Sequence, residues 1–467
     1  MDQYLTKNVT VVYLKGGFEM KKLLTLAGTM LLAVSIIGCS TEVPETVEPN
    51  TSTESETPAV ETEANEEVTI QFMHTMVEQE RQEVINGIIA DFEAENPGIK
   101  IEQIPTDEDS YETKITALGG SGELPAIMEF SQDQAKQNAK NEFIDFSAVK
   151  EVIDAKGEAS FFDGVLSVIK TEDGADYTGV PIGGWVQGIW YNKTAFADKN
   201  LAAPDTWDNI MTAAEAFSDP SNRKYGIAIP TANDGFSQQG FSQFALSNNA
   251  NVLDASGNAL FDSPEMIEAL TYYQSLYAYT MPGSNDVPVV KDAFMNGSAP
   301  MAIYSTYMIP SLYEAGTIGE VGFAVPTNKE GAAFGHIGLL SIKADMAENE
   351  RAASIKFLSY MLRDDVNIKW LHMSPGGQQP VLKAVAESDD YLSNPVIQSF
   401  EEIAGDISGA FNSLQVFGSI EGKNFLVMGD ITNTGLISDA VNRVTVKGEN
   451  PAEVAADVNA EIEALLE

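Results

Sequence analysis

The sequence is poor in the residues that most often carry metal and nucleophile chemistry. Its 467 residues include one cysteine, Cys39, and three histidines. A single cysteine cannot form an internal disulfide, and so few thiol and imidazole groups leave a zinc site without its usual ligands. The His-Glu-x-x-His motif, the Gly-x-Ser-x-Gly turn and the phosphate-binding loop are all absent. We therefore expect no bound metal, no cofactor and no enzymatic activity of these classes.

Basic residues are also scarce. Lysine and arginine number 27 against 69 aspartates and glutamates, which gives a formal net charge of −42. Such a negative field repels nucleic acids and anionic lipid head groups. The composition therefore argues against a nucleic-acid partner, and it is typical of a protein that stays soluble in a salty or wall-bound setting.

Long hydrophobic runs are absent, with one short exception near the start of the chain. Met20–Cys39 begins with two lysines, continues with an apolar stretch from Leu23 to Ile37 and ends with Gly38 and Cys39. This order is typical of a secretory signal peptide, and the apolar core is shorter than the ~20 residues of a membrane span. The ending resembles a lipobox, in which the cysteine is acylated and becomes the first residue of the mature protein. We therefore predict that Cys39 is lipidated and anchors the protein to the outer face of the cytoplasmic membrane.

The segments on either side of Cys39 differ sharply in composition. Residues 1–38 would form the removed signal peptide, and because residues 1–19 fit no signal pattern, we expect Met20 to be the true start. Residues 39–67 follow as a linker, in which positions 40–67 hold nine glutamates and three prolines but no lysine or arginine. Such a composition cannot bury enough apolar surface to offset the entropy of ordering, so we expect an extended, disordered linker.

Beyond residue 67, strand-like and helix-like patterns alternate. The segments are a strand at 68–72, a helix with apolar residues at 84–92, a strand at 99–104, a helix at 111–118 and a buried strand at 125–130. This order predicts parallel pairing and an α/β fold. Ligands in such folds bind beyond the carboxyl ends of the strands, which singles out the loops at 73–76 and 130–133.

Six segments resemble, in the same order, the bacterial extracellular solute-binding proteins of carbohydrate ABC importers, the family that includes maltose-binding protein. They are FEAENPGIKIE (92–102), GELPAIMEF (122–130), GIWYNK (188–193), LAAPDTW (201–207), NGSAPMAI (296–303) and the helix-like 350–363. The resemblance covers about residues 68–467. One departure is Pro300, where the family often has alanine.

The resemblance implies a two-lobed α/β fold of the periplasmic-binding-protein type. Each lobe would contain a mostly parallel sheet flanked by helices, and hinge crossings would join the lobes. Lobe 1 would comprise 68–184 plus 327–377, and lobe 2 would comprise 185–326 plus 378–467. Two lobes joined in this way can close around a ligand.

A sugar presents flat CH faces and a rim of hydroxyls, so its recognition needs aromatic platforms and planar polar groups. Trp185 lies beside Gly183 and Gly184 in the first implied crossing, and it is either a ligand platform or a core residue. Asp133 follows a buried strand at the end where ligands bind, and it is either a binding carboxylate or a helix N-cap. The resemblance gives Asp133 and Phe130 the positions of a sugar-binding aspartate and an aromatic residue.

Further candidates lie in other loops. Tyr307 falls where the family often has a stacking tryptophan, and it is either a platform or a rim residue. His74 follows the first strand and either donates to a ligand hydroxyl or satisfies a backbone carbonyl. Gln378 lies in another implied crossing, and Asn233 and Phe236 belong to a polar loop that could reach a ligand from lobe 2. By contrast, we expect Trp190 and Trp207 to pack in the core and His336 to have a structural role.

Together these patterns predict a lipid-anchored substrate-binding protein that captures a sugar between two lobes, acts as a monomer and delivers the sugar to ABC permease subunits. A secreted glycoside hydrolase is an alternative, because 69 acidic residues can supply a catalytic pair. A receptor for glycerol phosphate or a polyol is another, since QFMHTM (71–76) resembles the first loop of glycerol-phosphate receptors. A receptor that serves a sensor is a third.

Overall fold

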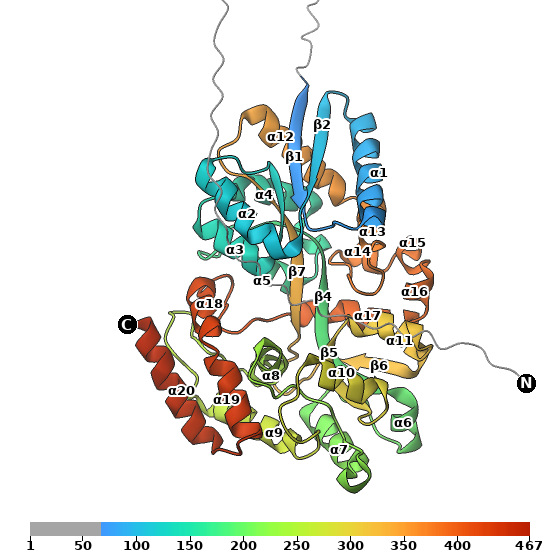
Figure 1. Cartoon of the computed structure of the whole chain (residues 1–467), viewed down its shortest axis with the longest axis vertical. Helices are drawn as coiled ribbons and strands as arrows, with labels where there is room; N and C mark the ends of the chain where they lie inside the picture. The colour runs from blue at the N-terminus through green and yellow to red at the C-terminus, as the bar shows by residue number, and fades with distance from the viewer. Residues whose placement is uncertain (1–66) are drawn as a thin grey trace, which may run out of the picture. The chain divides into compact units, whose positions relative to one another are not determined.

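A computed structural model describes residues 67–467, which belong to one compact unit, Ala64–Glu467. The predicted signal peptide, Cys39 and all but the last residue of the predicted linker lie outside the described residues. In the described part of the chain the helices form two groups, one above the other in Figure 1, and strands run from one group to the other. We refer to the groups as the upper and lower lobes, as they stand in Figure 1.

The strands join into a single sheet. They are β1 (Val68–His74), β2 (Ile99–Pro105), β3 (Ile127–Ser131), β4 (Val180–Asn192), β5 (Met301–Ser305), β6 (Val321–Ala324) and β7 (Phe334–Ile342). Their order is β2-β1-β3-β7-β4-β5, and β6 also pairs with β4. Strand β1 is parallel to β2 and β3, whereas β7 and β4 pair antiparallel with their neighbours.

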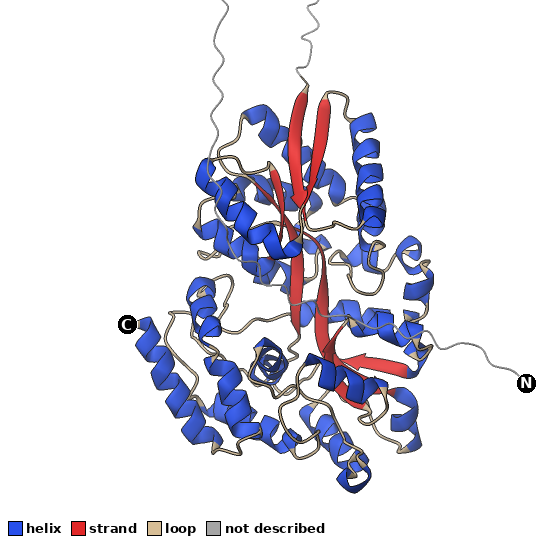
Figure 2. Ribbon diagram, in the orientation of Figure 1, coloured by secondary structure: helices blue, strands red, loops and turns tan. Residues whose placement is uncertain are grey.

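The two-lobed α/β architecture agrees with the prediction, but the sheet differs from the expected pair of mostly parallel sheets. Strand β4 has 13 residues, enough to leave the upper lobe, where it pairs with β7, and to reach β5 and β6 in the lower lobe (Figure 2). Strand β7 in turn pairs with both β3 and β4. The β4–β7 pair therefore carries one continuous sheet from lobe to lobe, and among the strands named above parallel ladders join only β1 to β2 and β1 to β3.

Helices surround the sheet in each lobe (Figure 1). The upper lobe has α1 (Gln79–Glu95), α2 (Glu108–Ser121), α3 (Gln132–Lys140), α4 (Phe146–Lys156), α5 (Asp163–Val168), α12 (Glu348–Met361) and α13 (Asp364–Leu371). The lower lobe has α6 (Lys193–Asp198), α7 (Trp207–Phe217), α8 (Gly235–Ser247), α9 (Pro264–Tyr277), α10 (Val287–Met295), α11 (Met308–Glu314), α18 (Phe425–Thr434), α19 (Leu436–Thr445) and α20 (Pro451–Leu466). Beside the crossing lie α14 (Lys383–Ala386), α15 (Asp389–Leu392), α16 (Pro395–Gln398) and α17 (Glu401–Gly409). The residue limits of the lobes stay a prediction.

Local sequence signals account for several helix starts. The Thr206 side chain accepts a hydrogen bond from the Asn209 amide at the start of α7, as expected for an N-cap. Ser263 caps α9 in the same way, with proline at the first helical position. At the start of α3, Ser131 and Gln134 form a capping box. This box fixes the turn from β3 into α3 and hence the direction in which Asp133 points.

Two hydrophobic clusters stabilise the structure. One surrounds Phe72 and Phe357 in the upper lobe, extends along the crossing strands and continues into the lower lobe, where it includes Phe294 of α10 and Leu312 of α11. The other surrounds Phe244 and Tyr273 in the lower lobe. Burial of apolar area stabilises a fold by roughly 25 cal/mol per Å² removed from water. Because the first cluster spans the crossing, it stabilises the contact between the lobes as well as the upper lobe.

Three chain segments meet where the lobes join. Gly184 of β4 pairs with Ile337 of β7, and it exchanges two backbone hydrogen bonds with Gln379, of 2.7 and 3.1 Å. A Cβ atom on Gly184 would lie 2.5 Å from the carbonyl oxygen of His336. Only glycine allows this approach. Gly183 and Gly184, which the sequence singled out, therefore lie where β4, β7 and the segment at Gln379 are in close contact.

Candidate functional site

An aromatic cluster lies beside this junction. The ring of Trp185 is centred 6.3 Å from that of Tyr307 and 5.6 Å from that of His336, against which it stacks at 27°. Phe334 adds a fourth ring at 5.8 Å. Tyr307 is 51% exposed, and the other three rings are half-buried. The cluster thus offers aromatic faces that a ligand can reach, which is the arrangement that suits the CH faces of a sugar.

Residues on both lobes line a cavity of about 210 Å³ next to this cluster. Asp133 and Gln137 of α3 belong to the upper lobe, while Gln239 of α8 and Thr432 of α18 belong to the lower lobe. Phe334 lines the cavity and also contacts Trp185. The aromatic cluster and the cavity, whose lining has both polar and apolar side chains, are therefore parts of one candidate site between the lobes.

Asp133 is exposed, and it is not the N-cap of α3, because Ser131 takes that role. Burial lowers the pKa of the nearby His336 imidazole. The negative charges of Asp133 and Glu108 oppose this shift but do not cancel it. His336 is therefore neutral at pH 7. The structure excludes the N-cap interpretation of Asp133 and places this residue in the lining of the cavity. A role in binding stays a prediction.

Gln378 lies at the same junction. Its side-chain oxygen would be 3.2 Å from a Cβ atom on Gly183, and the adjoining Gly377 lies against the Tyr307 ring. Gln378 is half-buried. Trp185, Tyr307, Asp133 and Gln378, which lie far apart in the sequence, are thus gathered around one region.

The other four predicted residues lie differently. Phe130 is buried, with its ring edge-on to Tyr111. His74 is fully buried, with one ring nitrogen 2.9 Å from the Gln103 side chain and the other accepting from the Met76 amide. Burial lowers its pKa. Both ring nitrogens of His74 are therefore occupied within the protein.

Asn233 and Phe236 lie at the start of α8. The Asn233 side chain accepts a 2.7 Å hydrogen bond from Ser438 on α19. Phe236 is 9% exposed, and its ring packs edge-on against Tyr304. A role in binding for these two residues, as for His74 and Phe130, stays a prediction. The expected core positions are confirmed for Trp190, which is fully buried, and for Trp207, which stacks on Tyr272 at 4.1 Å.

The structure adds residues that the sequence did not single out. Glu129 accepts hydrogen bonds from the backbone and the hydroxyl of Thr75 at 2.7 and 2.9 Å. Arg81 donates to Ser374 at 2.8 Å and thereby connects the start of α1 to the 374–379 segment. An acidic residue inside the apolar run PAIMEF was a usable signal for Glu129, whereas nothing in the local sequence marked Arg81.

Lys136 is the most unusual charged group near the cavity. It lies one turn beyond Asp133 on α3 and is 5% exposed. Its ammonium group lies 4.3 Å from the ring centre of Phe425 on α18 and 3.5 Å from the Ser419 hydroxyl, and no carboxylate within residues 67–467 forms an ion pair with it. Burial lowers its pKa to about 8. Lys136 therefore joins the lobes through a cation–π contact.

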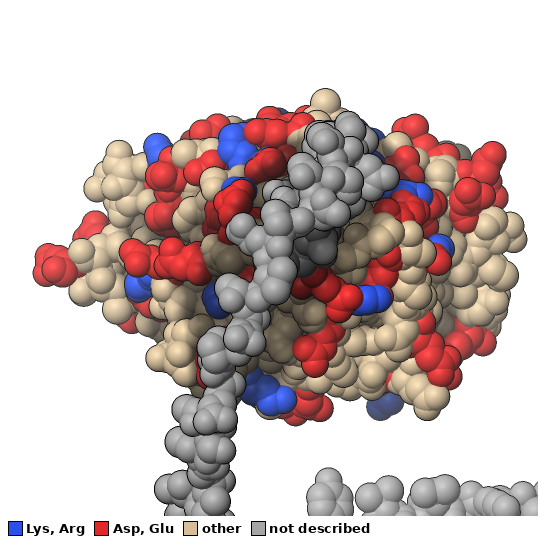
Figure 3. Space-filling view, turned by 90° about the horizontal axis from the view of Figure 1, so that it is seen from above, with Lys and Arg blue, Asp and Glu red and all other residues tan. Residues whose placement is uncertain are grey.

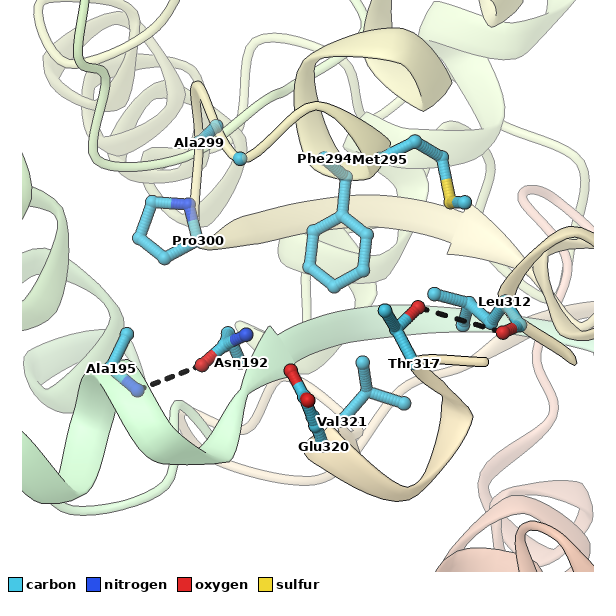
Figure 4. Close-up of a pocket in the computed structure, with 11 residues that line it drawn as sticks. Asn192, Ala195, Phe294, Met295, Ala299, Pro300, Leu312, Thr317, Glu320 and Val321 are labelled. Carbon is cyan, nitrogen blue, oxygen red and sulfur yellow. Dashed lines mark hydrogen bonds between the residues drawn. The ribbon is translucent and has the colours of Figure 1, made fainter. Parts of the chain in front are cut away.

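A second cavity, of about 240 Å³, lies in the lower lobe, and its lining contains no residue of the aromatic cluster (Figure 4). Phe294, Leu312 and Val321 give it an apolar lining. Two of its polar groups are already used, because Asn192 accepts from the Ala195 amide and Thr317 donates to the Leu312 carbonyl. This cavity is therefore mainly apolar, and the exposed carboxylate of Glu320 is a further polar group in its lining.

The surface charge agrees with the composition. Acidic side chains outnumber basic ones over the face seen in Figure 3. Within residues 67–467, no group of three or more His, Cys, Asp or Glu side chains is placed to hold a metal ion. Nor does any helix between these residues have the length and apolar character needed to cross a membrane.

Comparison with known proteins identifies the class. Residues 87–398 match the model of the bacterial extracellular solute-binding protein family, and the chain belongs to this family. It is 48% identical over 379 residues to the putative ABC transporter periplasmic-binding protein YcjN of Escherichia coli K12, covering 81% of this chain and 88% of that protein.

Two more distant proteins agree with this assignment. The chain is 24% identical over 355 residues to the multiple sugar-binding protein of Streptococcus mutans, covering 71% of this chain and 79% of that one. Its fold is similar to that of the sugar-binding protein MalE of Xanthomonas citri, with a TM-score of 0.71, 17% identity and coverage of 85% and 97% of the two chains. The latter similarity shows the two-lobed fold.

The Lys136→Met variant should be more stable than the wild type at pH 7. A lysine whose pKa drops from 10.5 to about 8 on folding binds fewer protons in the folded state, so the free energy of unfolding rises with pH between these values. Below pH 8 the buried charge costs up to about 3 kcal/mol, less what the Phe425 contact returns. Urea unfolding should therefore show a gain for Lys136→Met that shrinks by about half near pH 9.5.

Lys140→Met is the matched control, because Lys140 lies one turn further along α3 and is exposed. Its unfolding free energy should follow the wild type at both pH values. Equal gains for the two variants would contradict the role of burial at Lys136.

Proposed function

We propose that this protein is a lipid-anchored, extracellular substrate-binding protein of an ABC importer, which captures a sugar or oligosaccharide between its lobes and delivers it to the permease. The observation that carries this proposal is the aromatic cluster of Trp185, Tyr307, Phe334 and His336 beside a cavity lined from both lobes. The names of the similar proteins from Streptococcus mutans and Xanthomonas citri support a carbohydrate ligand.

Binding works through contacts on both lobes. A ligand that touches only one lobe has equal affinity for open and closed forms and shifts nothing. A sugar between α3 and α8 would contact Asp133 above and Gln239 below, while its CH face lies against Trp185. Hydrogen bonds from both sides then favour closure, and the hinge lies where β4, β7 and Gln379 meet.

Delivery and anchoring complete the proposal. The similarity to an ABC transporter periplasmic-binding protein supports transfer of the closed form to membrane permease subunits. Cys39, at the end of the signal-like segment, would carry the lipid, and the acidic linker would give the two-lobed body reach. The protein would work as a monomer, without nucleic acid, metal or cofactor.

A thermal-shift screen against sugars, sugar phosphates and polyols tests the ligand class. A ligand at ~100 times its dissociation constant adds about 2.7 kcal/mol to the unfolding free energy, so a clear rise in melting temperature is expected with a neutral sugar. The ligand should be recovered chemically intact. Degradation of the ligand would support a glycoside hydrolase instead, and a response confined to glycerol phosphate or a polyol would support that receptor class.

The Trp185→Ala variant should bind this ligand about 2 kcal/mol more weakly, or ~30-fold, because truncating a central aromatic contact typically costs this much. Titration calorimetry measures the loss. Trp185→Phe, which keeps a ring, should lose less, and both melting temperatures without ligand should stay near wild type because Trp185 is only half-buried. Asp133→Ala should weaken binding too. Wild-type affinity in either alanine variant would remove that residue from the site.

The Cys39→Ser variant should lose its attachment to the membrane. Without the thiol no acyl chain can be added, so the protein should move from the membrane fraction to the medium or periplasm. Labelling cells with a tagged fatty acid measures this, with the wild type as the labelled reference. Persistent label on Cys39→Ser would contradict the anchor.

A further inference from the structure

Glu129 is a carboxylate inside an otherwise apolar strand. It is half-buried on β3, between buried Met128 and Phe130. One of its oxygens, Oε2, accepts both hydrogen bonds from Thr75. Burial raises the pKa of this carboxyl, while the two bonds from Thr75 oppose the rise. Holding the loop at Thr75 in place needs only Oε2 of Glu129.

The second oxygen, Oε1, has no hydrogen-bond partner among residues 67–467, and no basic side chain there forms an ion pair with Glu129. The positive charge of Arg81 opposes the rise in the pKa of this carboxyl, but the Arg81 guanidinium is engaged elsewhere. It donates to the Ser374 hydroxyl at 2.8 Å and to the Met76 sulfur at 3.3 Å, and it lies 3.6 Å from Glu78. The Glu129 charge is therefore left without a counter-ion.

Glu129 is connected to Tyr307 of the aromatic cluster through Arg81. A chain of contacts connects the two residues, from Thr75 and Met76 to Arg81, then to the 374–377 segment, whose Gly377 lies against the Tyr307 ring. A free acceptor therefore lies on the upper-lobe side of the region that holds the aromatic platforms.

We propose that Glu129 is a ligand-binding residue whose Oε1 accepts a hydrogen bond from a hydroxyl group of a neutral sugar, and that its charge excludes ligands that carry a phosphate. This inference rests on the proposed function and specifies the ligand class. A half-buried carboxylate with a free lone pair is satisfied by a hydroxyl donor. A phosphate in place of that hydroxyl would meet the half-buried Glu129 carboxylate, and like charges at such short range repel each other.

The test compares neutral probes with their phosphate esters on the full chain carrying Cys39→Ser. Glucose is paired with glucose 6-phosphate and glycerol with glycerol 3-phosphate, and maltose is added as a larger neutral probe. We expect binding of at least one neutral probe and no detectable binding of its ester. Glu129→Gln should weaken that binding roughly 10- to 100-fold, since a hydrogen bond to a charged group is lost.

The Glu129→Gln variant keeps an oxygen that can accept from Thr75, so its melting temperature without ligand should match the wild type. Glu108→Gln is the matched control, because it removes one charge from the same neighbourhood at an exposed position of α2. Its affinity for the neutral probe should stay within about twofold of wild type. An equal loss in both variants would show a general field effect and overturn the direct contact.

Two further results would overturn the inference while leaving the receptor function intact. One is wild-type affinity of Glu129→Gln for a neutral probe that the wild type binds. The other is tighter binding of a phosphate ester than of its neutral partner. Binding of no probe in a broad screen, by contrast, would count against the proposed carbohydrate function itself and against this inference with it.

Discussion

The structure depends on the close backbone contact at Gly184. There, β4 lies against β7 and also exchanges hydrogen bonds with Gln379, and a side chain at this position would collide with the His336 carbonyl. The absence of a Cβ atom lets three segments from distant parts of the sequence pass through one narrow junction. Because each segment continues with a side chain of the candidate site, namely Trp185, His336 or Gln378, the junction gathers the candidate site as well as joining the lobes.

On this account, the negative charge of Glu129 makes the site oppose anionic ligands. The chain carries a net charge of −42, and the two least solvated charged groups near the cavity, Glu129 and Lys136, lack ion-pair partners among residues 67–467. Unpaired charges of this kind reduce stability, and they are tolerated where binding or closure uses them. On this account Lys136 meets Phe425 across the lobes, while Glu129 keeps one oxygen free for a hydroxyl donor.

Local patterns in the sequence predicted the α/β class, the N-caps at Thr206 and Ser263, and the core positions of Trp190 and Trp207. The rule that ligands bind at the carboxyl ends of strands singled out the loop before Asp133, whereas Trp185 was predicted from its place beside two glycines in a crossing that the family resemblance implied. The single mixed sheet could not be predicted in this way, because β7 inserts between β3 and β4 from far along the chain. Arg81 and Lys136 were missed for the same reason, since their partners Ser374 and Phe425 are remote in sequence. His74 looked available in its loop but is enclosed by Gln103 and Met76.

The most direct test of this account is a crystal structure of the protein with the neutral sugar that stabilises it most. The account predicts density between α3 and α8, with a sugar face against Trp185 and a hydroxyl within hydrogen-bond distance of Glu129 Oε1. It also predicts contacts from both lobes to the same ligand. A sugar bound in the lower-lobe cavity beside Phe294, or one that touches a single lobe, would contradict it.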